Sequence, residues 1–229
     1  MKVELLTPKR IIELFFIHAI EGARFAHKSK AKYPSGFDIL EEEYHIDIIV
    51  NISDEDISLA KKLASSGVAS GHDKFLQSIP FLVDISWSRA MWQEFDTYRV
   101  GVSKQSESTM HTLTKDSFSF SDFESEFDSE YTIWKKEEVV GRFLAMVGCI
   151  KEDLNSGKIS DKEARETLKG CLPECFIQKR RVSLNFASMK TIYFQRYNHR
   201  AMEWRHFCDY MKKELPLFND ICNLPEIEL

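Results

Sequence analysis

The sequence predicts an α+β fold. Apolar residues recur with helical spacing over several long segments, and short β-branched or alternating runs lie between them. These segments do not follow one another in the regular strand–helix–strand order of a parallel α/β sheet. With 229 residues, of which 43% are hydrophobic and 29% charged, the chain is long enough to build a full-sized core. We therefore expect residues 1–229 to form a single domain.

Charge and cysteine usage limit the class of protein. The chain has 31 Lys and Arg against 36 Asp and Glu, a formal charge of −5, which argues against a protein that mainly coats nucleic acid. Glu13 and His18 interrupt the apolar stretch 11–20, so we expect a helix there and neither a membrane span nor a signal peptide. Five unpatterned cysteines are typical of free thiols in a reducing cytoplasm.

In the N-terminal part, apolar spacing predicts a helix over residues 8–26. A loop is expected over 28–44, which is rich in lysine and acidic residues. The β-branched run 45–52 predicts a strand. Ser53 and the acidic residues after it favour a helix start, and we expect that helix to end near Ser66.

The middle of the chain is less regular. Small residues predict a loop over 67–71, and a short helix is expected over 73–79. The aromatic stretch 80–98 favours helix or mixed structure. Residues 117–130 are rich in Ser, Phe and acidic residues, which indicates a surface insertion that forms a partly packed lid or loop.

The C-terminal part predicts helices over 134–154 and 160–169, the second with a capping box at its start. A basic, alternating strand is expected over 176–184. Two consecutive helices follow over 185–197 and 200–214.

A polar string over residues 98–111 is the first candidate site. It holds two cations, three serines, a Gln and a Glu within 14 residues. Serine hydroxyls and backbone N–H groups beside an Arg or Lys hold a phosphate through charge-assisted hydrogen bonds. A solvated loop explains the same composition.

Asn185 and Arg196 are the second candidate. Eleven residues at about 100° each come within about 20° of three full turns and span roughly 16 Å, so both side chains share one helix face. Met189 and Ile192 lie between them on that face. The stripe either lies along an elongated ligand or faces the core with two satisfied polar ends.

Other chemical motifs are weaker. Cys171 and Cys175 have a spacing that metal ligands use, but no second pair accompanies them, so structural cysteines are favoured. Residues 67–71 do not form a Walker loop, because the Gly-Lys-Ser/Thr ending is absent. No Gly-x-Ser-x-Gly nucleophile motif is present.

Three segments between about residues 67 and 205 resemble, in order, the flavin-dependent thymidylate synthase (ThyX) family. The first segment follows Gly71 and His72, which match a Gly-His pair of the family. Lys74 and Gln77 replace the flavin-binding Thr and Glu that follow this pair.

The second segment, residues 98–110, is similar to the family signature Arg-His-Arg-x-x-Ser-x-Asn-Glu-x-Ser-x-Arg. The matching or mildly changed positions are Ser103, Gln105 and Ser108. Three Arg, the His and the Glu are replaced, the Glu by Ser106 and the last Arg by Met110. Over 92–111 the chain resembles a divergent, phage-associated branch of the family.

The third segment matches better. Residues 168–173 resemble the family's Ala-Arg-x-x-Leu-Pro, with Lys169 in place of the nucleotide-contacting Arg. The Asn185 and Arg196 pair corresponds to the family's Asn and, eleven residues later, an Arg that contacts the nucleotide. Where the family has an Asn and often a flavin-contacting His, this chain has Thr191 and Arg200.

The resemblance implies a central, mostly antiparallel sheet flanked by helices, and an FAD-dependent methyltransferase. In the family, reduced FAD mediates transfer of a one-carbon unit from methylenetetrahydrofolate to C5 of dUMP, giving dTMP, and NADPH reduces the flavin. No protein nucleophile is expected. The family builds its sites between the subunits of a homotetramer, so we expect a homo-oligomer in a bacterial cytoplasm, or in the cytoplasm of a phage-infected host, without membrane or stable nucleic-acid partners.

The resemblance also implies roles for single residues. The residues expected to bind the nucleotide are Arg99, Ser106, Ser108, Lys169 and Arg196. Those expected to contact the flavin are His72, Lys74, Gln77, Ser103, Gln105, Asn185, Thr191 and Arg200.

Alternatives remain open. The replacements at Ser106 and Met110 are compatible with another pyrimidine nucleotide such as dCMP, with hydroxymethyl transfer, or with a flavoprotein that lacks synthase activity. A non-catalytic nucleotide- or nucleic-acid-binding module that uses the basic run 179–181 is a candidate from another class. A structural domain without a ligand is the third.

Overall fold

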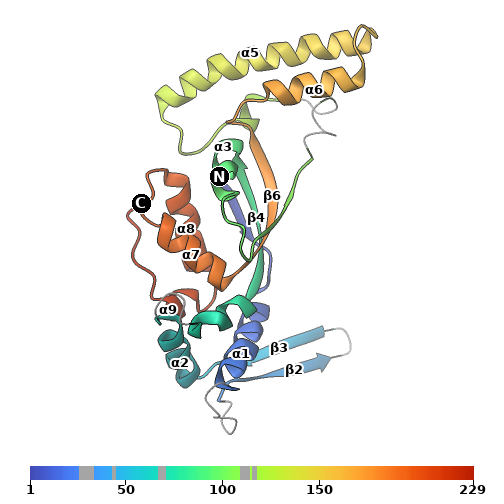
Figure 1. The fold of residues 1–229 in the computed structure, drawn as a ribbon. Helices are drawn as coiled ribbons and strands as arrows, with labels where there is room; N and C mark the ends of the chain where they lie inside the picture. The colour runs from blue at the N-terminus through green and yellow to red at the C-terminus, as the bar shows by residue number, and fades with distance from the viewer. Residues whose placement is uncertain (26–33, 43–44, 67–70, 109–113, 115–117) are drawn as a thin grey trace. The chain divides into compact units, whose positions relative to one another are not determined.

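The computed structural model describes residues 1–25, 34–42, 45–66, 71–108, 114 and 118–229 (Figure 1). Its elements, in chain order, are β1 (Lys2–Leu5), α1 (Lys9–Phe25), β2 (Gly36–Glu42), β3 (His45–Asn51), α2 (Asp54–Ala64), η1 (His72–Ser78), β4 (Pro80–Ser88), α3 (Arg89–Phe95), β5 (Ser103–Ser106), η2 (Phe120–Asp122), α5 (Glu130–Asn155), α6 (Asp161–Cys171), β6 (Ile177–Asn185), α7 (Phe186–Arg196), α8 (Met202–Glu214) and α9 (Phe218–Cys222). This mixture of helices and strands confirms the α+β class.

The strands form two sheets in the described part of the chain. The larger has the strand order β1-β4-β6-β5, in which strands distant in sequence are neighbours. The smaller pairs β2 with β3 antiparallel, in a register that runs from Gly36 opposite Asn51 to Glu42 opposite His45.

The chain divides into two compact units. The first unit consists of residues 1–2, 85–97 and 105–181. The second unit consists of residues 3–84, 98–104 and 182–229. The expectation of a single domain stays a prediction.

The first unit has its own hydrophobic core. It is built on α5 and α6, with Phe123, Val140, Phe143, Val147, Ile150, Ala164, Leu168, Leu172 and Phe176 buried together. The helix α6 begins with the expected capping box, because Ser160 Oγ accepts from Glu163 N (3.2 Å) and Ser160 N donates to Glu163 (2.8 Å). That backbone hydrogen bond lowers the pKa of the Glu163 carboxyl.

The Phe-rich segment contributes to this core. Phe123 is fully buried, and its ring lies 5.8 Å from that of Phe143. Phe118 and Phe120 are half-buried against the same cluster. The segment is thus partly packed over residues 118–130, whereas Ser117 lies outside the described residues; its status as an insertion stays a prediction.

Aromatic residues pack where β4 continues into α3. Trp87, Trp92 and Phe95 are buried, with ring centroids 5.4–6.2 Å apart in edge-to-face arrangements. Ser88 caps α3 by accepting a hydrogen bond from Met91 N. Residues 80–98 are therefore mixed structure, a strand followed by a short helix.

The second unit packs α1, α2, η1, α7, α8 and α9 around a second core. The buried face of α1 carries Ile12, Phe16, Ile17 and Ile20, as its apolar spacing predicts. Further along the chain, Phe186 at the start of α7 packs edge-to-face with Phe81 and Phe218. In the described part of the chain, no helix combines the length and apolarity that crossing a bilayer requires.

A buried carboxylate ties the end of α1 to the start of α2. Asp56 is 2% exposed and accepts from Arg24 Nε (2.7 Å) and from Ser35 Oγ (2.6 Å). Ser35 Oγ in turn accepts from Ser53 N (3.0 Å), and Ser53 caps α2 as predicted. The acidic first turn of α2 therefore has a structural role beyond its interaction with the helix dipole.

Several expectations on secondary structure were wrong. The predicted loop 28–44 contains β2 over Gly36–Glu42, whereas residues 28–33 and 43–44 lie outside the described residues, as do 67–70 of the loop expected at 67–71. The polar string 98–111 contains β5. Strand pairing explains both differences, because β2 pairs with β3 and β5 lies beside β6, so non-local hydrogen bonds override weak local signals.

Replacing Asp56 by alanine tests the buried ion pair. The variant leaves Arg24 without its carboxylate, so we expect the free energy of unfolding to fall by about 3–5 kcal/mol. Asp54→Ala removes an exposed carboxylate of the same helix turn, and its loss should stay below about 1 kcal/mol. Urea unfolding of both variants measures the difference; equal losses would show that the buried pair has no special weight.

Candidate functional site

The first candidate residue lies where β6 continues into α7. Asn185 is the N-cap of α7, and its Oδ1 accepts from Ser188 N (2.9 Å) while Ser188 Oγ accepts from Asn185 N (3.1 Å). Its backbone is extended, with φ −132° and ψ 170°, so Asn185 is not a helical residue. The face geometry predicted for Asn185 and Arg196 was therefore wrong at its first end.

The stripe between the two residues is core. Met189 and Ile192 are fully buried, so neither can touch a ligand. The interpretation of this face as a surface along an elongated ligand was wrong, and the core-facing alternative holds. Burial of these two side chains fixes α7 and thereby places its polar ends.

The loop that carries Gly101 approaches Asn185 closely. Gly101 has φ +68°, and a Cβ added there would lie 2.7 Å from Asn185 Nδ2. The Ser188 hydroxyl also donates to Gly101 O (3.5 Å). Glycine adopts a positive φ without strain and has no Cβ that would clash with Asn185 Nδ2. Gly101 therefore allows the first residues of the polar string to lie against the start of α7.

At the other end of α7, Arg196 is held in a cluster with Tyr98, Gln195, His199 and Trp204, here called the Arg196 cluster. Arg196 Nε donates to Tyr98 Oη (2.8 Å), and its Nη1 lies 2.8 Å from His199 Nε2. The guanidinium carbon lies 4.6 Å from the Trp204 ring centroid and 5.6 Å from that of Tyr98. Stacking and hydrogen bonds together fix a half-buried cation in one orientation.

Four members of this cluster, Tyr98, Gln195, His199 and Trp204, were not predicted as site residues from the sequence. Trp204 comes from α8, Tyr98 from the loop after α3, and His199 from the turn after α7. Tyr98 Oη also donates to Gln195 Oε1 (3.0 Å). His199 follows Arg196 by three residues, so sequence spacing could have indicated that contact. The contacts of Tyr98 and Trp204 with Arg196 depend on tertiary packing.

The residues expected to contact flavin on η1 project into solvent. Phe75 and Leu76 are buried, whereas His72, Lys74 and Gln77 are exposed. In a 3₁₀ helix, residues three apart lie above one another, so Lys74 and Gln77 share a face. The ion pair of Lys190 with Asp73 (3.8 Å) and the hydrogen bond of Lys190 Nζ to Ala64 O (2.6 Å) bring α7, η1 and α2 together.

Other predicted residues of the second unit are placed on its surface. They are Arg99, Ser103, Thr191 and Arg200, and all four are exposed. Thr191 uses its hydroxyl within α7, donating to Ala187 O (3.1 Å). The structure thus brings Asn185 to the Gly101 loop and Arg196 to Tyr98, and leaves these four side chains accessible.

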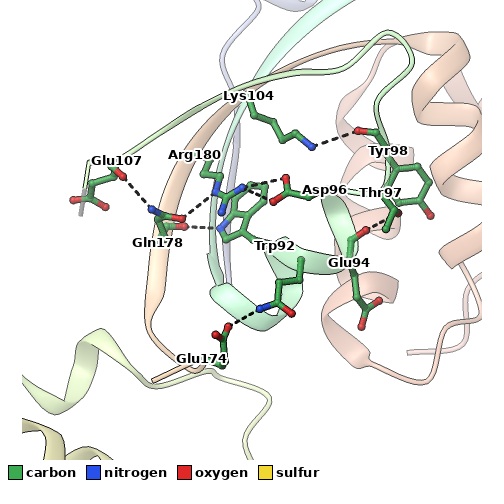
Figure 2. A network of polar contacts seen from close by, with 11 residues as sticks. Trp92, Glu94, Asp96, Thr97, Tyr98, Lys104, Glu107, Glu174, Gln178 and Arg180 are labelled. Carbon is green, nitrogen blue, oxygen red and sulfur yellow. Dashed lines mark hydrogen bonds and ion pairs between the residues drawn. The ribbon is translucent and has the colours of Figure 1, made fainter. Parts of the chain in front are cut away.

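The first unit holds a polar network on an aromatic base (Figure 2). Arg180 Nη1 lies 3.0 and 3.1 Å from the two carboxylate oxygens of Asp96, and its guanidinium carbon is 4.5 Å from the Trp92 ring centroid. Arg180 Nε donates to Gln178 Oε1 (3.0 Å), and Gln178 Nε2 donates to Glu107 O (3.0 Å). Arg180, predicted as part of a basic nucleic-acid-binding run, is committed to contacts within the unit.

This network adjoins predicted site residues of the polar string. Glu107 N donates to Lys179 O (3.1 Å), and the neighbouring residues Gln105, Ser106 and Ser108 are exposed. Met110 and His111 lie outside the described residues. Lys169 is exposed in the last turn of α6, where a cation also interacts favourably with the helix dipole.

The cysteines show no metal site. All five are free thiols, and no group of three metal-binding side chains occurs among the described residues. Burial raises the pKa of the Cys175 thiol, raises that of Cys222 to about 12, and raises that of Cys208 despite the nearby Arg196 charge. Cys171 is exposed and Cys175 is half-buried, and the interpretation of both as structural cysteines stays a prediction.

Two surface cavities of about 440 and 450 Å³ lie in the first unit along α5. Val139 and Pro173 line both, and Lys135 and Arg142 at their walls pair with Glu138. Neither cavity is lined by a predicted site residue, so the chemistry of the polar string and α7 is not theirs.

Comparisons with known proteins agree on one family. The family model described as thymidylate synthase complementing protein matches residues 23–217. Two crystal structures of ThyX from Helicobacter pylori with FAD and dUMP are similar over 97% of this chain: one at 18% identity and TM-score 0.61, covering 99% of that chain, the other at 20% identity and TM-score 0.59, covering 97%. No curated protein matches the chain.

Gly101→Ala tests the close approach at Asn185. The added Cβ forces a positive φ on alanine and displaces the Asn185 cap, so we expect the free energy of unfolding to fall by about 1–3 kcal/mol. Gly148, in the exposed interior of α5, has no atom within 4 Å of an added Cβ, and Gly148→Ala should instead raise stability by about 0.5–1 kcal/mol. Denaturant unfolding of both variants would contradict this account if they changed stability in the same direction.

Proposed function

This chain belongs to the family of thymidylate synthase complementing proteins, and we propose that it acts as the family's flavin-dependent thymidylate synthase, transferring a one-carbon unit to C5 of dUMP. The observation that carries the proposal is the family match over residues 23–217, which includes both ends of α7. At these ends Asn185 and Arg196 stand where the family has its Asn and its nucleotide-contacting Arg.

Arg196 is suited to hold the nucleotide phosphate. Its guanidinium is oriented before any ligand arrives, because Tyr98 and His199 contact two of its nitrogens and Trp204 lies against its face. A cation whose orientation is already fixed loses little side-chain entropy on binding an anion. The roles proposed for Arg99, Lys169, Ser106 and Ser108 rest on the family pattern and on their exposure.

The residues proposed to bind FAD include hydrogen-bond donors and a cation. Lys74 supplies the charge that a pyrophosphate needs, and Gln77 beside it supplies an amide that can donate and accept. A Cβ at Gly71 would crowd Lys74 at 3.2 Å, so glycine leaves that side chain room to move. When bound, FAD supplies the hydride transfer that reduces the one-carbon unit. Asn185 and the other residues proposed for flavin would orient it: His72, Ser103, Gln105, Thr191 and Arg200.

The state of Cys208 argues against this thiol as a protein nucleophile. Cys208 is the thiol whose pKa the Arg196 charge affects, yet it is fully buried and its pKa is raised. A buried neutral thiol is neither accessible to a substrate nor ionised. The flavin, not Cys208, is therefore the proposed route to C5 of the pyrimidine.

Exposure of the proposed ligand residues supports self-association. His72, Lys74, Gln77 and Arg200 are exposed in the single chain, whereas tight ligand sites bury most of the ligand surface. A second copy that covers these residues would enclose the ligand, as expected for a homotetramer. NADPH as reductant, methylenetetrahydrofolate as carbon donor and a cytoplasmic location are part of the same proposal.

One further candidate concerns the acceptor. Ser106 replaces the Glu of the family signature and is exposed beside Glu107, so a different pyrimidine nucleotide such as dCMP, or hydroxymethyl transfer, is the second proposal. Competition between dUMP and dCMP for the purified protein, followed by mass analysis of the product, distinguishes these reactions.

The visible absorption spectrum is the first test. We expect the purified protein to show flavin bands and to release FAD on denaturation, because the family reaction requires a bound flavin. A colourless protein that does not take up added FAD would overturn the proposed function. The Arg196 cluster would then be a purely structural element.

Arg196→Ala tests the nucleotide role. Removing a charge-assisted contact of about 1.5–3 kcal/mol should weaken dUMP binding roughly tenfold to a hundredfold. FAD binding should stay unchanged. Isothermal titration measures both, with Arg142→Ala, an arginine 82% exposed on α5, as the control. Unchanged dUMP affinity in Arg196→Ala would exclude this role.

A further inference from the structure

We propose that Gln178 is a positioning residue that holds Ser106 and Ser108 in place for the nucleotide, with Arg180 setting the direction of its amide. The inference rests on the proposed function for the binding role of these serines. It stands on contacts within the first unit, which connect a buried aromatic cluster to the exposed end of the polar string.

The direction of the Gln178 amide follows from chemistry. Gln178 is 8% exposed. Its Oε1 must face Arg180 Nε (3.0 Å), because a guanidinium only donates, and its Nε2 must face Glu107 O (3.0 Å), because a carbonyl only accepts. The flipped amide would oppose donor to donor and acceptor to acceptor. The Gln178 amide therefore has one orientation, in which it accepts from Arg180 and donates to Glu107.

Arg180 is itself fixed. Asp96 holds its Nη1 through both carboxylate oxygens, and the guanidinium lies over the Trp92 ring at 4.5 Å (Figure 2). Trp92 is fully buried, packs on Trp87 and Phe95, and donates through Nε1 to the Gln178 backbone carbonyl (2.8 Å). The side chain of Gln178 is therefore held by Arg180, and its backbone by Trp92.

The hydrogen bonds of the Glu107 backbone fix two peptide planes. Glu107 N, which donates to Lys179 O (3.1 Å), belongs to the plane shared with Ser106. Glu107 O, which accepts from Gln178 Nε2, belongs to the plane shared with Ser108. Since a planar peptide unit extends from one Cα to the next, fixing both planes fixes the Cα atoms of both serines. The first of these hydrogen bonds is an ordinary backbone pair; the second depends on Gln178.

Gln178→Glu is the discriminating variant. It keeps the size of the side chain and an acceptor for Arg180, but it places a carboxylate oxygen against Glu107 O and removes the donor. Gln93→Glu, on an exposed glutamine of α3 that donates to Glu174 (3.0 Å), makes the same chemical change away from these contacts. If Gln178→Glu fails to fold, Gln178→Met removes the amide at similar volume.

Two measurements test the proposal. In unliganded Gln178→Glu, hydrogen exchange of the peptide that contains residues 105–108 should be faster than in the wild type and in Gln93→Glu, with α5 and α6 unchanged. In turnover assays, KM for dUMP should rise about tenfold, as expected from one unsatisfied carbonyl, while kcat and FAD affinity stay within about twofold. A change in KM without a change in kcat or FAD affinity distinguishes positioning from general destabilisation. General destabilisation would lower FAD affinity and would speed hydrogen exchange throughout the protein.

The outcomes separate this inference from the proposed function. A wild type that binds neither FAD nor dUMP would overturn the proposed function and, with it, the binding role of the serines. A wild type that binds both, with wild-type exchange over 105–108 or unchanged KM in Gln178→Glu, would overturn the positioning role alone. Faster exchange together with the KM rise is the result that supports it.

Discussion

A guanidinium that leaves water needs partners for its charge and its five N–H groups, and this requirement organises the chain at three arginines. Arg24 meets it with the buried Asp56, which ties α1 to α2. Arg180 meets it with Asp96 and the Trp92 ring. Arg196 meets it with the Tyr98 hydroxyl, the His199 ring and the Trp204 ring. The three guanidinium groups are therefore held in place by different sets of partners.

Local signals predicted the elements whose stability is local. The acidic turn after Ser53 and the capping box at Ser160 mark the starts of α2 and α6, because caps are made by residues three apart in sequence. The same reasoning failed for β2 and β5. The sequence of β5, Ser103–Ser106, is polar throughout, and such a strand forms only because a neighbouring strand offers hydrogen-bond partners, which no local pattern records.

In the candidate site, too, local sequence patterns predicted some features, whereas contacts between distant segments were missed. The family pattern predicted Asn185 and Arg196 as site residues, which stays a prediction. Helix geometry misplaced Asn185, since an N-cap has extended backbone and does not follow the helical angle. The contact of Tyr98 with Arg196 and the contact of Gln178 with Glu107 each join segments more than 70 residues apart. Spacing arguments cannot reach such contacts. For such contacts the sequence shows only which residue types, such as Gln178, need hydrogen-bond partners when they are buried; it does not show which partners they have.

The replacements in the family signature gain a physical meaning from the Arg196 cluster. Across the five replaced positions, the number of arginines falls from three to one and the formal net charge falls by one. Tyr98 and Val100 stand for arginines, Arg99 for the His, Ser106 for the Glu, and Met110 for the last Arg. An arginine at position 98 would place a second guanidinium beside Arg196, whereas the Tyr98 hydroxyl accepts its hydrogen bond. The chain thus carries fewer cations in this segment, and the residue at position 98 contributes to the orientation of Arg196. Under the proposed function, the orientation of Arg196 by Tyr98, His199 and Trp204 matters for binding, because attraction to a phosphate depends on how well a cation is oriented as well as on the number of cations.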